Sequence, residues 1–290
     1  MSDAIDQNAL YPIREVARLT GVNPITLRAW ERRYNLLEPV RTESGHRLYT
    51  QEHIDFLHET LRLMEEGIPI SRIKAVISES PPRQLAATDV LAHAGDKSLL
   101  IESICLAAAQ LQVQGLERLL DRLFADYSLN ALRMLSAEVE QKLQQQDNNA
   151  VPLAFWHSCL TRRLQVRLHS LYSQPFLPSK RIVIQKAPQT PDYLAKLVAL
   201  FCFEQGYQAI ELSDSLTLDQ VLTVARPLSI QAMLFVDYNA TATAQWTASF
   251  AKYASMRSWV LGDDQLANRQ PPSVNCELRV WAQWFTALNL

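Results

Sequence analysis

A helix–turn–helix pattern near the start of the chain constrains its fold more than any other feature. Apolar residues recur at helical spacing between Ile13 and Leu19, and Thr20-Gly21-Val22 follows as a tight turn that uses the left-handed backbone glycine tolerates. Asn23 is then a favourable N-cap, and Pro24 suits the first position of a second helix because its missing N–H costs nothing there. We expect this second helix to run over about 24–34.

A two-stranded wing is expected directly after the second helix. Leu36-Leu37-Glu38-Pro39 closes that helix, and the stretch from Arg41 to Tyr49 has the pattern of a hairpin with Gly45 in its turn. Thr50 can cap a third helix, whose apolar residues repeat at helical spacing as far as Gly67, and a fourth helix begins at about Pro69. The sequence thus predicts a winged helix-turn-helix domain, all-α with a β wing, over residues 1–80.

The positive charge of the chain is local. The net charge of the whole molecule is −2, so it is not a general nucleic-acid coat. Between residues 10 and 50, however, seven arginines face four glutamates, and every basic residue there is arginine. Because arginine suits bidentate contact with phosphate and guanine, this stretch is the candidate for binding nucleic acid.

Three further regions follow, which makes the chain multidomain. Residues 81–98, which open with Pro81-Pro82, are predicted to be a linker, and residues 99–178 a central helical bundle. Over residues 179–290 short apolar runs alternate with amphipathic stretches at about 191–205, 217–226 and 242–255. The predicted strands are Arg181–Gln185, Ala209–Leu212, Ala232–Val236 and Ser258–Leu261, with a fifth strand or edge within Cys276–Phe285. This alternation predicts a C-terminal α/β, Rossmann-like domain with a flavodoxin-like parallel sheet.

Several kinds of site are excluded or unsupported by composition. No two of the seven glycines are spaced for a phosphate-binding loop, and no two of the four cysteines lie close enough for a zinc pair. We therefore expect no metal, and reduced, buried thiols. The polar start of the chain and the absence of a long apolar run predict a cytoplasmic protein without a membrane partner.

The predicted winged helix-turn-helix domain over residues 1–80, called the head below, resembles the DNA-binding domain of the MerR family of transcriptional regulators. The resemblance rests on TLRAWERRYNLLEPVRTESGHRLYTQEHID, which begins at Thr26, and it is specific over about 70 residues. It implies that the second helix enters the major groove and that the wing grips the flanking backbone. It also implies double-stranded promoter DNA as the partner, a homodimer that reads a palindrome, and RNA polymerase as a further partner. The DNA-contacting residues it implies are Thr26, Arg28, Arg32, Arg33, Arg41, His46, Arg47 and Tyr49, whereas Trp30, Leu36, Leu37 and Leu48 are assigned to the core.

The Ala29-Trp30 and Gly45-His46-Arg47 variants resemble the MlrA-like subgroup, which is related to cobalamin-dependent photoreceptor repressors. That resemblance implies a cobalamin-binding domain with a DxHxxG loop after its first strand and a Glu-His pair in the helical bundle. Here the matching loop is degenerate, because Tyr193 stands where the histidine should be and Lys196 where the glycine should be, shortly after Pro191. The stretch LAFWH, which ends at His157, has no Glu-His dipeptide. We therefore expect no cofactor.

Two alternatives to a plain DNA-binding regulator stay open. In one, the C-terminal domain still senses a small molecule or recruits a protein partner. In the other the chain is an enzyme, because aspartates lie near the expected carboxyl ends of strands, where α/β sites form; these are Asp192, Asp214, Asp237, Asp263 and Asp264. Isolated aspartates at strand ends more often cap turns, so we expect no enzymatic activity.

Overall fold

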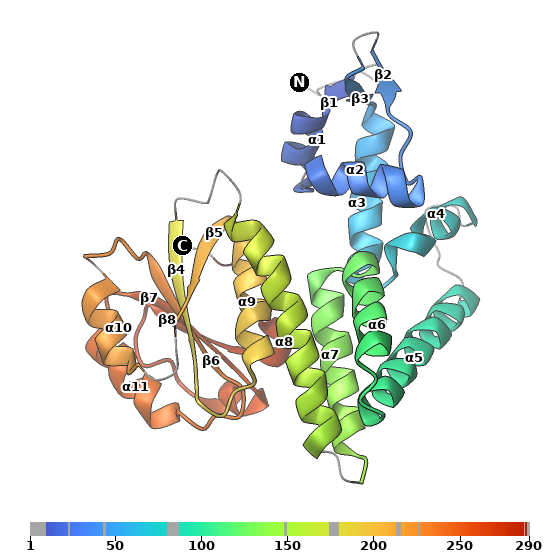
Figure 1. Cartoon of the computed structure of the whole chain (residues 1–290). Coiled ribbons are helices and arrows are strands. Elements are labelled where there is room, and N and C mark those ends of the chain that lie inside the picture. Colours follow the sequence, from blue (N-terminus) through green and yellow to red (C-terminus); the bar gives the residue numbers. More distant parts are fainter. Residues whose placement is uncertain are drawn as a thin grey trace. The chain divides into compact units, whose positions relative to one another are not determined.

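The computed structural model describes residues 10–22, 24–42, 45–79, 87–147, 150–173, 180–212, 216–225, 227–286 and 288. The chain divides into two compact units (Figure 1). The first takes in residues 1–103 and 121–138, and the second residues 104–120 and 139–290. Among the described residues, no helix is long and apolar enough to span a membrane.

The first unit begins with the winged helix-turn-helix that the sequence predicts. Its elements in chain order are β1 (Tyr11–Pro12), α1 (Ile13–Thr20), α2 (Pro24–Tyr34), β2 (Val40–Arg41), β3 (Arg47–Tyr49), α3 (Gln51–Glu65) and α4 (Ile70–Glu79). The wing has one strand more than predicted, since β1 pairs with β3 antiparallel and gives the order β1-β3-β2. Two residues that include a proline carry too little strand pattern to be recognised in the sequence.

Local chemistry explains where the helices of the head begin and end. Gly21 ends α1 in the left-handed conformation, with φ +74°, and its N–H donates to the Ala17 carbonyl at 2.9 Å. Asn35, at φ +47°, ends α2 in the same region of backbone space, which asparagine tolerates better than most residues. The predicted cap Asn23 lies outside the described residues. Thr50 caps α3 in a capping box with His53.

One apolar core holds the head together. Leu27 and Trp30 of α2 pack there, and the predicted core residues Leu36 and Leu37 are buried, while Leu48 is half-buried. Leu19, expected on the apolar face of α1, is instead exposed. The core therefore uses one face of α2 and leaves the opposite face to solvent.

The central helices are α5 (Ala87–Ala109), α6 (Val113–Asp126), α7 (Leu129–Gln144) and α8 (Ala150–Tyr172). Because α5 already begins at Ala87, residues 87–98 are helical, and the linker predicted over 81–98 is wrong for that part. The helices of the predicted bundle are also divided between the two units, since residues 121–138 belong to the same unit as the head. Within that unit the Tyr34 hydroxyl donates to Asp126 Oδ1 at 2.9 Å, and Ser128 Oγ donates to the Met64 carbonyl at 3.2 Å.

The second unit contains the predicted parallel sheet. Its strands are β4 (Lys180–Lys186), β5 (Tyr207–Glu211), β6 (Ala232–Asp237), β7 (Arg257–Gly262) and β8 (Cys276–Val280). All neighbours pair parallel in the order β5-β4-β6-β7-β8, which is the flavodoxin-like order, and β8 is the fifth strand that the sequence left open.

Helices cover both faces of this sheet (Figure 1). The helices α10 (Leu218–Ala225) and α11 (Thr243–Lys252) share an apolar core with β4, β6 and β7 on one face. The helix α9 (Asp192–Glu204) packs on the other face and also contacts α8. Two short 3-10 helices, Asp264–Asn268 and Trp281–Gln283, flank β8. The strands are buried because both faces are covered, which explains their continuous apolar pattern.

Candidate DNA-binding surface and a buried polar network

The exposed face of α2 is basic. Arg28, Arg32 and Arg33 are all exposed. Arg28 and Arg32 are four residues apart and share one side of the helix, and Arg33 directly follows Arg32. Within the part of the chain that the structure describes, none of the three forms an ion pair. Thr26, two residues before Arg28, is half-buried. This face can therefore offer three guanidinium groups to an acidic partner.

The wing arginines are arranged differently, because both are paired within the head. Arg41 Nη2 lies 2.9 Å from Glu31 Oε1, and Arg47 Nε lies 2.6 Å from Glu31 Oε2. The hydrogen bond to Glu31 raises the pKa of Arg47 above its ordinary value. Sequence reasoning missed this bridge, since Glu31 is 10 and 16 residues away from its two partners.

The turn of the wing is held by hydrogen bonds to Thr42. The Gly45 N–H donates to the Thr42 carbonyl at 2.8 Å, and the His46 N–H donates to Thr42 Oγ1 at 3.0 Å. His46 itself is exposed. The imidazole of His46 therefore stands at the outer end of the hairpin, where an approaching phosphate can meet it.

Tyr49 does not lie where the sequence placed it. It was expected to clamp phosphate from the wing, but the residue is only 1% exposed and belongs to the core of the head. Its ring lies edge-on to that of His53, with centroids 6.0 Å apart, and its buried hydroxyl has no hydrogen-bond partner among the described residues. Burial raises the pKa of Tyr49. The central strand β3 turns this side chain inward, which the two-fold alternation of a strand allows at one residue in two.

In the second unit, the degenerate loop carries a buried polar network. Tyr193 is fully buried at the start of α9, and its hydroxyl donates to Glu140 Oε2 of α7 at 2.6 Å. Glu140 Oε1 lies 3.1 Å from His157 Nε2 of α8, and the His157 and Tyr193 rings lie 5.1 Å apart. Burial, followed by the nearby Glu140 carboxylate, raises the pKa of Tyr193 well above its ordinary value. The stretch that ends at His157 has no Glu-His dipeptide, whereas the fold brings Glu140 and His157 together from two helices.

The other two residues of that loop lie nearer the surface. Pro191 directly precedes α9 as its N-cap residue. Lys196 Nζ forms an ion pair with Glu211 Oε2 at 3.2 Å. Lys196 therefore fills space on the helix face where a glycine would leave room.

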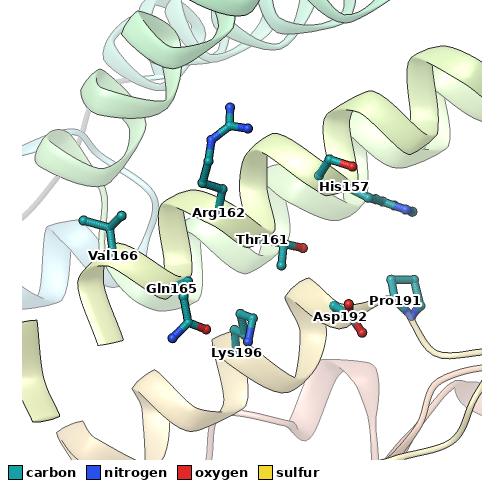
Figure 2. A pocket seen from close by; sticks show the side chains of 9 residues that line it. His157, Thr161, Arg162, Gln165, Val166, Pro191, Asp192 and Lys196 are labelled. Atoms are coloured by element: carbon teal, nitrogen blue, oxygen red, sulfur yellow. The ribbon is translucent and has the colours of Figure 1, made fainter. Parts of the chain in front are cut away.

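An open groove of about 590 Å³ runs between α8 and α9 beside the network (Figure 2). Thr161 and Gln165 of α8 face Asp192 and Lys196 of α9 across it. His157 lines the groove as well, so one side chain belongs both to the groove and to the buried network.

The aspartates near the strand ends act as caps or ion-pair partners. Asp237, at the end of β6, is fully buried and accepts hydrogen bonds from Thr241 N at 2.8 Å, Ala242 N at 3.1 Å and Trp246 Nε1 at 2.9 Å. Asp263 caps the following 3-10 helix through Gln265 N, and Asp192 pairs with Lys186. Asp214 lies outside the described residues. A second hollow of about 460 Å³ is lined in part by Gln189 and by Thr241, whose N–H already donates to Asp237.

The four cysteines are buried free thiols, as expected. Burial raises the pKa of Cys202 and of Cys276, which keeps these thiols protonated. No group of three or more His, Cys, Asp or Glu side chains among the described residues is arranged to hold a metal ion.

Comparison with known proteins places the head in a family. The model of the MerR HTH family regulatory proteins matches residues 11–80. The HTH-type transcriptional regulator MlrA of Escherichia coli (strain K12) is 50% identical over 70 residues, which are 24% of this chain and 29% of that protein. MlrA of Salmonella typhimurium (strain SL1344) is 47% identical over 76 residues, 26% of this chain and 31% of that protein. The HTH-type transcriptional repressor CarA of Myxococcus xanthus is 42% identical over 74 residues, 25% of this chain and 26% of CarA.

These matches span less than a third of each of those three relatives. Among solved structures, the Methanosarcina barkeri monomethylamine corrinoid protein aligns with a TM-score of 0.49 at 12% identity, over 65% of this chain and 96% of that one. The helices, the wing and the sequence of the first unit agree on one conclusion: residues 11–80 form a MerR-type helix-turn-helix domain, homologous to the corresponding regions of the regulators MlrA, CarA and CarH.

Proposed function

We propose that this protein is a transcriptional regulator that binds specific sequences of double-stranded promoter DNA through residues 11–80. The observation that carries the proposal is the group of three exposed arginines on α2, in a MerR-type head that also carries a wing. A helix of this kind fits the major groove, and unpaired guanidinium groups bind phosphate oxygens and guanine edges.

The side chains divide by their position on the head. Thr26 and Arg28, in the first half of α2, are assigned to base edges or to the phosphates at the groove. Arg32 and Arg33, at the end of α2, are assigned to the backbone, as is His46 at the tip of the wing. Arg41 and Arg47 are assigned to phosphates at the flank of the wing, where their ion pairs with Glu31 restrain them. Tyr49 supports the wing from the core.

The regulator acts as a homodimer on a palindromic site, and RNA polymerase bound at the same promoter is its further partner. Two heads related by a two-fold axis present two α2 helices to two half-sites, which is how helix-turn-helix proteins generally obtain enough contacts for specificity.

The test is a binding assay with the full-length chain and duplexes selected by it from a random-sequence library. We expect Arg28→Ala to weaken binding to the selected duplex by at least tenfold. Arg167→Ala, which removes an exposed arginine from α8, serves as the matched control and should leave binding unchanged. Failure of the selection to enrich any sequence would contradict the proposal.

We further propose that the second unit works without cobalamin. Tyr193 supplies no imidazole for cobalt, its ring is fully buried, and its hydroxyl is committed to Glu140. Lys196 brings a long cation, paired with Glu211, to the position where the cofactor requires a glycine. The residues present therefore do not fit the cofactor. Incubation with hydroxocobalamin followed by desalting should leave no bound chromophore, and a stoichiometric visible absorbance would refute this.

A second candidate function, sensing of a small molecule, is supported by the groove between α8 and α9 (Figure 2). Its volume lies in the range of ligand pockets, and Thr161 and Gln165 offer hydrogen-bond donors. Its two cations, Arg162 and Lys196, are already paired with Glu117 and Glu211, so a polar ligand rich in acceptors fits better than a strong anion. A polar ligand rich in acceptors should raise the melting temperature of the wild type. The loss of this rise in Thr161→Trp, which fills the groove, would support this candidate.

A further inference from the structure

The two arginines of the wing stand directly opposite each other. Arg41 of β2 and Arg47 of β3 are register partners in an antiparallel pair. Like charges in such positions repel each other and destabilise the hairpin. A hairpin with strands of two and three residues has few hydrogen bonds with which to offset this repulsion.

Glu31 of α2 supplies the missing counter-charge to both. Its Oε1 accepts from Arg41 Nη2 at 2.9 Å and from Arg47 Nη2 at 3.3 Å, and its Oε2 accepts from Arg47 Nε at 2.6 Å. The side chains of Glu31 and Arg47 are 16% and 27% exposed, against 54% for Arg41. The bridge to Arg47 is therefore the more sheltered of the two.

The bridge has two consequences for a domain that reads DNA. It fixes the wing to α2, so that the helix and the hairpin approach the duplex as one body. It also keeps Arg47, and part of Arg41, from binding phosphates at random. The exposed positive charge that remains on α2 belongs to Arg28, Arg32 and Arg33.

We propose that Glu31 is a positioning residue that sets DNA specificity, by holding the wing against α2 and by restraining the two wing arginines. This inference rests on the proposed DNA binding. Glu31 is acidic and lies in a surface that is proposed to bind a polyanion, yet it improves the discrimination between DNA sequences.

The first experiment compares Glu31→Gln with wild type in the full-length chain. Glutamine keeps the size of the side chain and removes its charge. We expect tighter binding to random duplex, no gain on the selected duplex, and a specificity ratio that falls by about tenfold. Each arginine freed to bind phosphate should steepen the slope of log affinity against log salt by about 0.9.

Glu38→Gln is the matched control. It makes the same change of charge in the same head, at an exposed side chain near Lys74 rather than near the wing. We expect it to leave the specificity ratio and the salt slope close to those of the wild type. An equal effect of the two variants, or a loss of affinity for both duplexes at an unchanged slope, would overturn the inference.

A rescue variant guards against simple misfolding. In Glu31→Gln/Arg47→Gln the opposed charges are gone, so the salt slope and the specificity ratio should move back toward the wild-type values. A double variant that behaves as badly as Glu31→Gln alone counts against the inference.

A second readout needs no DNA. We expect backbone amides of the wing, over residues 40–49, to exchange with deuterium faster in Glu31→Gln than in the wild type or in Glu38→Gln. If no duplex is selected by the wild type, the proposed function fails, and the exchange measurement still decides whether Glu31 holds the wing. Unchanged exchange in the wing would refute the positioning role.

Discussion

At the scale of single residues, chemistry depends on which neighbours the fold supplies. Tyr193 and Tyr49 are both tyrosines with fully or almost fully buried rings, yet the Tyr193 hydroxyl binds a carboxylate and the Tyr49 hydroxyl has no partner among the described residues. A buried polar group is costly when it loses its partner and cheap to remove when it had none. The two residues should therefore respond in opposite ways to the same substitution.

Tyr193→Phe removes the donor at 2.6 Å from Glu140 and leaves a buried carboxylate with one partner fewer. We expect a loss of stability of about 1–3 kcal/mol, seen as a lower midpoint of thermal or urea unfolding. Tyr253→Phe is the control, because it removes a hydroxyl that bonds to Thr223 at the surface, and it should cost less than about 0.5 kcal/mol. Equal midpoints for the two variants would show that the network contributes nothing.

Tyr49→Phe removes a buried hydroxyl without a partner in the described structure. We expect unchanged or slightly higher stability, and an affinity for the selected duplex within twofold of the wild type. A binding assay and a melting curve measure both quantities. A tenfold loss of affinity would mean that this phenol reaches phosphate when DNA is bound, as the sequence first suggested.

At the scale of elements, the helix α3 ties the wing to the rest of the head. Its capping box uses histidine as the third residue: the Thr50 N–H donates to His53 Nδ1 at 3.1 Å, and His53 N donates weakly to Thr50 Oγ1 at 3.4 Å. Thr50 directly follows β3, so this cap fixes the angle between the wing and α3. Because Nδ1 acts as an acceptor there, the cap requires neutral histidine.

This cap should make the stability of the head depend on pH. Burial lowers the pKa of His53 below its ordinary value, so the folded head favours the neutral imidazole. The stabilisation is fully present above the pKa of the unfolded chain and is lost as the pH falls through the lower pKa of the folded state. We expect the melting temperature to fall as the pH is lowered below about 6.5, the ordinary pKa of histidine. His53→Gln keeps an acceptor at this position but cannot titrate, and should reduce that drop. An identical pH profile in the variant would contradict this role.

At the scale of the whole molecule, one unit carries the DNA-binding head and the other the parallel sheet. The head is homologous to the corresponding regions of known regulators, whereas the second unit joins Tyr193, Glu140 and His157 in its interior. The polar network satisfies itself, as buried polar groups must. We therefore expect the second unit to fold without a ligand.

A homodimer on a palindrome has a footprint that can be measured. We expect protection of two half-sites whose centres lie about 10 base pairs, or a multiple of that, apart. Nuclease footprinting on a selected duplex gives the spacing, and light scattering of the free protein gives the mass. Protection of a single half-site by a monomer would contradict the dimer.

The sequence by itself determined the elements that depend on local chemistry. The helices of the head, the Gly21 turn, the Thr50 cap and four of the five strands of the parallel sheet follow from spacing, capping and apolar runs, which are local in the sequence. Only the tertiary structure decided which side chains face one another over long distances. It buried Tyr49, joined Glu31 to two wing arginines, and assembled a Glu–His pair from α7 and α8. Such contacts depend on how elements pack, and a pattern read along the chain carries no record of that packing.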